Sequence, residues 1–234
     1  MEAQKKSALD TKVISSFLVW LCRLLTGIRA RQTAPIDKKV PCIYYANHSS
    51  HLDGVVIWSC LHPSARQTTH PVAAEDYWNK TRLRRYLSRR IFGAILIPRL
   101  PNAKEGAKEA TPQSTQEAAQ NDKRQNALEL MQATLDKEES LIIFPEGTRG
   151  DGEAIAPFKS GLWHLSLQNP QAQLVPVYLE NLNRVLPKGS RLVVPIICSA
   201  TFGPPIDCAS AQENKQDFLA RAKSALEELH HDPH

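Results

Sequence analysis

The chain has 234 residues, of which 42% are hydrophobic, so it is long enough to bury the core of one substantial domain. Its five cysteines are odd in number and include no Cys-x-x-Cys pair, which argues against a disulfide framework or a zinc site and favours a reducing, cytoplasmic setting. The formal net charge of +5 suits nucleic acid, an anionic membrane or acidic small molecules, but no nucleic-acid-binding signature supports the first partner.

The N-terminal segment, residues 1–32, is interpreted as amphipathic and membrane-associating. Residues 13–28 are apolar, but Arg23 interrupts them and they fall short of the ~20 clean residues that a bilayer-spanning helix needs. An apolar stripe at helical spacing predicts an interfacial helix instead. The stripe comprises Ile14, Phe17, Leu21, Leu24 and Ile28. A core helix and an uncleaved signal-like segment are the alternatives.

Residues 47–53, Asn-His-Ser-Ser-His-Leu-Asp, contain the first candidate catalytic pair. Residues 40–46 read as a strand and residues 54–61 as a buried helix, which puts His48 on the turn between them and Asp53 near the helix start. A neutral imidazole can take the proton of an attacking alcohol when a carboxylate fixes its tautomer and stabilises the imidazolium. The spacing therefore predicts a general base oriented by a carboxylate, with an ordinary structural pair as the alternative.

Basic residues concentrate between positions 80 and 90, in a run that reads as a helix. Such a run is either a solvated helix face or a binding surface for anionic groups. Residues 93–99, Gly-Ala-Ile-Leu-Ile-Pro-Arg, follow it as a short aliphatic segment that ends in Arg99. Residues 101–122 are rich in Ala, Gln, Lys and Glu without large apolar side chains, which predicts a mobile insertion.

Residues 144–149, Phe-Pro-Glu-Gly-Thr-Arg, form the second conspicuous block. They follow an apolar strand pattern at residues 140–144 that stops at Pro145. Gly147 permits backbone conformations closed to other residues, and Arg149 offers a planar fork of donors that matches a phosphate. A structural turn would account equally well for Pro145 and Gly147.

The remaining chain continues the alternation of helices and strands. A helix is expected over residues 123–136, and strands over residues 174–178 and 192–197. An amphipathic helix near the C-terminus is marked by Phe218, Ala222, Ala225 and Leu229. This alternation predicts an α/β domain over residues 33–234.

The two blocks together resemble the glycerophospholipid acyltransferase family, whose signatures are Asn-His-x4-Asp followed by Phe-Pro-Glu-Gly-Thr-Arg. Residues 93–99 resemble a further signature that ends in arginine, and residues 174–178 resemble the family's last one. The resemblance spans about residues 40–206. It implies a mixed sheet flanked by helices, with the blocks gathered around one cleft that the N-terminal helix docks onto a membrane.

The resemblance also implies an activity like that of a 1-acyl-sn-glycerol-3-phosphate O-acyltransferase of phospholipid biosynthesis. Such an enzyme moves a fatty acyl group from acyl-CoA or acyl carrier protein to the free hydroxyl of lysophosphatidate. The implied partners are these co-substrates, membrane lipid and the membrane surface. The implied location is the cytoplasmic side of a membrane, with peripheral or monotopic attachment. No cofactor and no metal are implied.

Roles for single residues follow from the same resemblance. His48 is implied as the base and Asp53 as the carboxylate that orients it. Arg99 and Arg149 are expected to hold the phosphate of the acceptor. The acceptor site is expected to be shaped by the other substrate-binding residues, Glu146, Gly147 and Thr148. The tetrahedral oxyanion is expected to be stabilised by backbone N–H groups of residues 47–53.

Three alternatives stay open at this point. The acceptor could be glycerol 3-phosphate or another lysophospholipid, because the signatures do not separate these substrates. The chain could be a membrane-binding homologue without turnover, although such a protein has no need of a base. A metal-dependent phosphoesterase with His48, His51 and Asp53 as ligands is the third alternative, and it lacks a second set of ligands.

Overall fold

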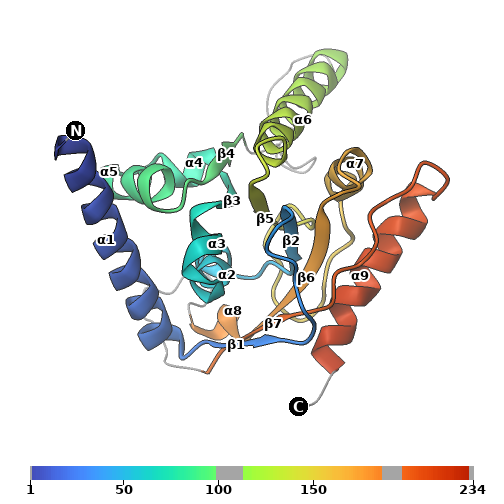
Figure 1. The fold of residues 1–234 in the computed structure, drawn as a ribbon. Coiled ribbons are helices and arrows are strands. Elements are labelled where there is room, and N and C mark those ends of the chain that lie inside the picture. The colour runs from blue at the N-terminus through green and yellow to red at the C-terminus, as the bar shows by residue number, and fades with distance from the viewer. Residues whose placement is uncertain (1, 99–112, 186–196, 232–234) are drawn as a thin grey trace.

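The structure is a computed structural model that describes residues 2–98, 113–185 and 197–231 (Figure 1). The described residues form a seven-stranded sheet with the order β1-β7-β6-β2-β5-β3-β4, flanked by helices. The strands are β1 (Arg29–Gln32), β2 (Cys42–Ala46), β3 (Thr69–Ala74), β4 (Ile95–Ile97), β5 (Ser140–Ile143), β6 (Gln173–Glu180) and β7 (Ser199–Phe202). The predicted α/β fold with a mixed sheet is confirmed.

The direction of the strands places several loops along one edge of the sheet. Strand β2 pairs in parallel with β5 and β6, and β3 pairs in parallel with β5 and β4. Strand β7 runs antiparallel to β6, and β1 lies parallel to β7 at the end of the sheet. The segments that follow β2, β3, β4 and β5 therefore leave the sheet at the same edge, where parallel α/β sheets usually carry their functional groups.

Helices cover both faces of the sheet (Figure 1). They are α1 (Glu2–Thr26), α2 (Asp53–Cys60), α3 (Pro63–Gln67), α4 (Glu75–Trp78), α5 (Arg82–Tyr86), the π-helix η1 (Leu87–Ile91), α6 (Gln113–Leu135), α7 (Gly161–Gln168), α8 (Leu182–Val185) and α9 (Lys215–His231). One hydrophobic core lies under α1, α2 and η1, and a second lies under α6, α7 and α9. Strand β2 contributes side chains to both cores, because successive residues of a strand point to opposite faces of the sheet. Tyr44 belongs to the first core and Tyr45 to the second.

The structure differs from the sequence-based prediction in several elements, and one expected strand lies almost entirely outside the described residues. The expected strand at 192–197 lies outside the described residues except for Ile197, which is exposed and precedes the observed strand β7. The short strand β1 was not predicted, since its four residues are all exposed and contain no apolar alternation. Helix α6 starts at Gln113, so the later part of the expected insertion is helical, while residues 99–112 lie outside the described residues.

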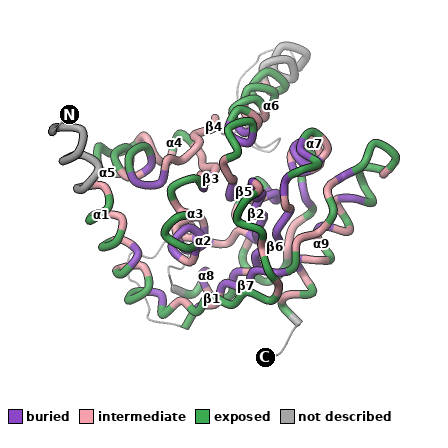
Figure 2. Tube along the Cα trace, in the orientation of Figure 1, coloured by how far each residue is buried: buried purple, intermediate pink, exposed green. Residues whose placement is uncertain are grey.

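The N-terminal helix α1 has two apolar faces rather than the one predicted. Ile14 packs against the first core, whereas Phe17 and Leu24 are exposed, so the predicted single stripe is divided between the two faces. The exposed face carries Val13, Phe17, Trp20 and Leu24. Figure 2 shows that exposed residues recur along the described part of α1. The packed face explains why α1 is fixed to α2, and the exposed face is left without a partner in the described part of the chain. Within that part, no helix is long and apolar enough to cross a membrane.

Candidate active site

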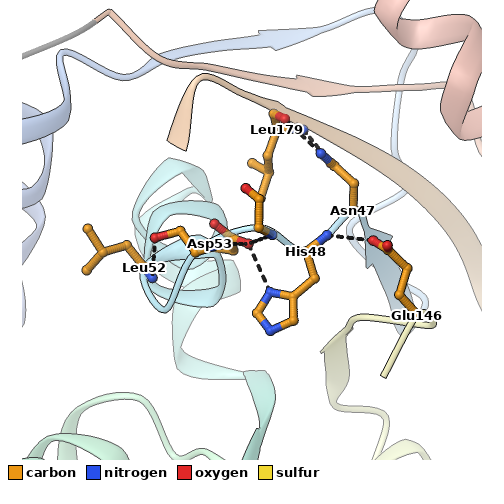
Figure 3. Close-up of polar contacts among 8 residues, drawn as sticks. Asn47, His48, Leu52, Asp53, Glu146 and Leu179 are labelled. Carbon is orange, nitrogen blue, oxygen red and sulfur yellow. Dashed lines mark hydrogen bonds and ion pairs between the residues drawn. The ribbon is translucent and has the colours of Figure 1, made fainter. Parts of the chain in front are cut away.

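The two sequence blocks meet because β2 and β5 are adjacent strands. Tyr45 lies opposite Ile143 in the parallel pair, and His48 and Glu146 each follow three residues later. The backbone N–H of His48 donates to Glu146 Oε1 at 2.7 Å, although the two residues are 98 positions apart in the chain. In return, the N–H of Gly150 donates to the His48 carbonyl oxygen at 2.8 Å. The segment after β5 thus holds the turn after β2 through two hydrogen bonds, of which Figure 3 shows the one to Glu146.

His48 and Asp53 form a hydrogen-bonded pair. Nδ1 of His48 lies 2.9 Å from Oδ2 of Asp53, a carboxylate with no exposed surface. The same Oδ2 accepts the backbone N–H groups of Ser49 at 2.7 Å and Ser50 at 2.8 Å. Asp53 is also the first residue of α2, where the helix dipole favours a negative charge. The backbone therefore holds the carboxylate of Asp53 in the position from which it orients the imidazole.

The other edge of the His48 ring is accessible. Because an ionised carboxylate only accepts hydrogen bonds, the bond to Asp53 assigns the ring proton to Nδ1 and leaves Nε2 as an acceptor. Nε2 has no hydrogen-bond partner among the described residues, and the side chain is 21% exposed. Phe144 stacks on the imidazole with ring centroids 4.2 Å apart and fixes the plane of the ring. This arrangement lets Nε2 accept a proton from a molecule bound beside it.

Asn47 anchors the start of the same turn. Its side-chain Nδ2 donates to the carbonyl oxygen of Leu179 at 2.8 Å, and its Oδ1 accepts the N–H of Leu179 at 2.7 Å (Figure 3). These two bonds extend the pairing of β2 and β6 by one side chain. Asn47 is therefore a positioning residue for His48, with both functional atoms of its amide occupied.

Glu146 is a buried brace rather than an exposed binding group. The residue is 3% exposed, and its Oε2 accepts the N–H of Ala156 at 2.9 Å while Oε1 holds His48. Burial raises the pKa of the Glu146 carboxyl above its ordinary value, and the hydrogen bonds from Ala156 and His48 oppose that shift. With both oxygens occupied, Glu146 acts on the site through the turn that carries His48.

We expect Glu146→Gln to lower kcat about 10-fold to 100-fold with only a small loss of thermal stability. Glutamine keeps one acceptor but turns an N–H2 group toward the second backbone N–H, so one of the two bonds is lost. A shift of the His48 turn by about 1 Å is enough to cost roughly 10²-fold in rate. Glu129→Gln is the matched control, because Glu129 is exposed and lies on α6. Equal kcat values for the two variants would contradict the bracing role.

Gly147 adopts the backbone conformation that its residue type suggested. Its φ is +69°, and a Cβ placed there would lie 2.6 Å from Nζ of Lys159. The N–H of Lys159 also donates to the carbonyl oxygen of Pro145 at 2.8 Å. The aliphatic stem and ammonium of Lys159 therefore lie directly against Gly147, in a space that a side chain would close.

Of the two arginines expected at the phosphate, the structure describes Arg149 and not Arg99. Arg149 is partly exposed, makes no hydrogen bond or ion pair with the described residues, and immediately precedes Gly150, which is bonded to His48. Thr148 beside it is exposed. Arg99 lies outside the described residues, so its position relative to His48 remains an expectation.

The N–H groups of the first block are largely committed to other bonds. Those of His48, Ser49 and Ser50 donate to carboxylates, as described above. The N–H of Leu52 donates to Ser50 Oγ at 3.3 Å, and that of Asp53 donates to the Ser50 carbonyl oxygen at 3.4 Å. Each of these five groups already stabilises the turn itself, and the expectation that this block supplies the oxyanion donors stays a prediction.

Comparison with known proteins agrees with this geometry. A model of the Acyltransferase family matches residues 27–180, which is more than half of the chain and includes His48, Asp53, Glu146 and Arg149. This chain belongs to the Acyltransferase family. The resemblance inferred from the two sequence blocks is thereby confirmed.

Individual relatives match a smaller part of this Acyltransferase chain. A 1-acyl-sn-glycerol-3-phosphate acyltransferase of Limnanthes alba is 36% identical over 83 residues, which are 36% of this chain and 29% of the relative. The enzyme of that name from Cocos nucifera is 36% identical over 98 residues, covering 42% of this chain and 32% of the relative. The 1-acyl-sn-glycerol-3-phosphate acyltransferase alpha of Ovis aries is 31% identical over 92 residues, which are 39% of this chain and 32% of the relative. The matches thus span about a third of each curated relative.

A solved structure shows the same fold as this Acyltransferase family member. The crystal structure of the 1-acyl-sn-glycerophosphate (LPA) acyltransferase PlsC from Thermotoga maritima superposes with a TM-score of 0.65. The superposition covers 99% of this chain and 84% of that one, at 18% sequence identity. At that identity the likeness establishes the arrangement of helices and strands.

One group beside the Acyltransferase site could not be found from the sequence. The ring of His51 stacks on Tyr77 with centroids 4.0 Å apart, and the Arg84 guanidinium lies 4.2 Å from the centroid of the same Tyr77 ring. Tyr77 belongs to α4, which follows β3 at the same sheet edge as the turn that carries His48. No spacing in the sequence links these three residues. No cluster of three His, Cys, Asp or Glu side chains suited to a metal ion occurs among the described residues.

A pocket of about 810 Å³ lies beside the turn that carries His48. Asn47, His48 and Ser49 line one of its walls, and Tyr178 of β6 lines another together with residues of α9. Helix α9 lies beyond the residues that the family model matches, so this wall belongs to the C-terminal part of the chain. The pocket therefore brings His48 and Tyr178 of β6 to the same cavity.

Proposed function

We propose that this protein transfers a fatty acyl group from an acyl thioester to the free hydroxyl of lysophosphatidate, giving phosphatidate. The observation that carries the proposal is the His48–Asp53 pair, in which a buried carboxylate orients an imidazole whose Nε2 is accessible. The printed names of the relatives, 1-acyl-sn-glycerol-3-phosphate acyltransferases, support lysophosphatidate as the acceptor.

In the proposed reaction, Nε2 of His48 takes the proton of the acceptor hydroxyl as its oxygen attacks the thioester carbonyl. The negative charge of Asp53, 2.9 Å from Nδ1, stabilises the imidazolium that forms. When the tetrahedral intermediate collapses, the carbon–sulfur bond breaks and the thiolate leaves. The proton held by His48 then returns to that sulfur, so the base is regenerated without a covalent acyl-enzyme.

The acceptor phosphate is proposed to bind Arg149, with Arg99 as its second partner. Arg149 has no competing partner among the described residues, and a guanidinium pairs with phosphate through charge-assisted hydrogen bonds. Gly147 and Thr148 shape the adjoining surface of the same turn. Acyl-CoA or acyl carrier protein serves as donor co-substrate, and the chemistry requires no further cofactor.

A lipid-product assay tests the proposal. Purified protein is incubated with acyl-CoA or acyl carrier protein against lysophosphatidate, glycerol 3-phosphate and several lysophospholipids, and the products are identified by mass spectrometry. Phosphatidate from lysophosphatidate is expected at the highest kcat/KM. Product from a different acceptor alone would reassign the substrate, and no acylated product in any combination would favour a membrane-binding protein without turnover.

Exhaustive chelation of metal ions is expected to leave the rate of acyl transfer unchanged, whereas a loss of activity that zinc restores would favour a phosphoesterase.

We further propose that α1 attaches the protein peripherally to the cytoplasmic side of a membrane through its exposed apolar face. The double variant Phe17→Ser/Trp20→Ser should bind neutral phosphatidylcholine vesicles at least ~10-fold more weakly, because apolar insertion drives such binding. The control Leu130→Ser/Ile197→Ser removes two other exposed apolar side chains. Equal flotation of both variants with vesicles would contradict the assignment of α1.

A further inference from the structure

Helix α5 and the following η1 present a strongly basic face. Residues 77–98 contain no aspartate or glutamate. The side chains that point outward from α5 and η1 include two large apolar ones, Leu83 at 67% exposure and Tyr86 at 39%. The exposed cationic side chains on the same face are Arg82, Arg85 and Arg89. Ser88 and Ile91 are buried on the opposite face, so these arginines form one continuous outer surface, which we call the α5–η1 face.

The arginines of this face are not neutralised by any carboxylate among the described residues. Among the described residues, the ion pairs involve other side chains, and none joins Arg82, Arg85 or Arg89 to a carboxylate. Within the described chain, the Arg85 side chain donates to the carbonyl oxygen of Asn79 at 3.2 Å and to no carboxylate. Three like charges held on a short helical segment repel one another, and that repulsion is relieved by a surface rich in anions.

The inner side of α5 is tied to the catalytic turn. Arg84 points inward, where its guanidinium covers one face of Tyr77 and one N–H approaches the Tyr77 carbonyl oxygen at 3.5 Å. Tyr77 in turn stacks on His51, three residues after His48. The α5–η1 face is therefore held in a defined position relative to the turn that carries the base.

The α5–η1 face also adjoins the apolar helix α1. Helix η1 packs against α1, and Figure 1 shows α5 beside the same helix. Exposed Leu83 and Tyr86 among arginines make an amphipathic surface, which suits the boundary between lipid headgroups and acyl chains. An acidic soluble protein would complement the charges but would leave the apolar face of α1 without a partner.

We propose that the α5–η1 face binds the anionic headgroups of a lipid bilayer. Arg82, Arg85 and Arg89 pair with headgroup phosphates, while Leu83 and Tyr86 enter the interface. This contact extends the attachment proposed for α1, and through the Arg84–Tyr77–His51 stack it places the catalytic turn at the lipid surface. Because it is measured by binding alone, its failure is distinguishable from a failure of the proposed acyl transfer.

The test compares vesicle binding of the full chain with that of the triple variant Arg82→Gln/Arg85→Gln/Arg89→Gln. Flotation is measured with vesicles of phosphatidylcholine alone and of phosphatidylcholine with 30% phosphatidylglycerol, an amount chosen on the order of natural anionic fractions. Affinity for the anionic vesicles should fall at least ~10-fold, whereas affinity for neutral vesicles should stay within about twofold. High salt should weaken binding of the unmodified chain to anionic vesicles in the same way.

The matched control removes the same charge elsewhere. Lys123→Gln/Arg124→Gln/Lys137→Gln alters three exposed basic side chains on and just after α6 and should leave both affinities unchanged. Equal losses in the two triple variants would mean that net charge acts without a defined face, and this would overturn the proposal. Unchanged vesicle binding, combined with a raised KM for acyl carrier protein alone, would also overturn it and assign the face to an acidic protein.

Discussion

His48→Ala is expected to lower kcat for acyl transfer at least ~10²-fold, because general-base catalysis contributes about 10²–10⁴-fold. The fold should remain intact, since the backbone N–H and carbonyl oxygen of His48, which bond to Glu146 and Gly150, are kept in the variant. The rate is measured with lysophosphatidate and acyl-CoA, alongside thermal unfolding. Wild-type kcat in folded His48→Ala protein would remove His48 as the base.

A histidine at the other end of α2 provides the matched control. His62 is exposed and caps α3, so His62→Ala should keep kcat within about twofold.

The variant Asp53→Asn separates the orienting role of Asp53 from its negative charge. An amide oxygen in the position of Oδ2 can still accept the N–H groups of Ser49, Ser50 and the imidazole. We expect a strong loss of kcat in this variant through the missing negative charge. An unchanged rate would mean that Asp53 only positions the ring.

Arg149→Ala is expected to lower kcat/KM for lysophosphatidate about 30-fold or more. Removing one partner of a desolvated charge pair costs roughly 2–5 kcal/mol, and the partly exposed position of Arg149 favours the lower end of that range. A neutral monoacylglycerol acceptor, and thioester hydrolysis by water, should be affected far less because neither presents a phosphate. Arg149→Lys should restore activity only in part, since lysine supplies charge without the planar fork.

The same pattern is expected for Arg99→Ala, which the family signature assigns to the same phosphate. Arg124→Ala on α6 is the control, because its side chain is exposed and bonds only to Asn121 within the described chain. If the phosphorylated and unphosphorylated acceptors lose activity equally in both variants, the arginines hold the fold or the acyl donor, and the phosphate assignment is withdrawn.

Much of the central sheet could be predicted because its strands are buried on both faces. Strands β2 and β5 are continuous apolar runs, and β6 carries the run at 174–178 that also matched a family signature. The edge strand β1 and its neighbour β7 were missed, since Arg-Ala-Arg-Gln and Ser-Ala-Thr-Phe have little apolar character. Their pairing depends on the neighbouring strand rather than on their own composition.

The same contrast holds for α1 and for the site. Helical spacing in the sequence indicated an apolar helix, but it could not assign Ile14 to the core and Phe17 to the outer face, because both faces of that helix carry apolar residues. Glu146 was expected to shape the acceptor site, whereas its two oxygens hold the backbone of His48 and Ala156. That role arises only from the register between β2 and β5.

The sequence by itself determined the family and the approach of His48 to Asp53, because five residues at a strand–turn–helix junction bring a side chain on the turn back to the helix start. Only the tertiary structure decided which N–H groups the Asp53 carboxylate accepts, that Glu146 braces the turn, and that Tyr77 lies between His51 and Arg84. The contacts that Glu146 and Tyr77 make with residues 48–51 join segments that strand pairing brings together, whereas Asp53 meets its donors within one turn. In both cases, residue spacing alone does not tell which donor meets which acceptor.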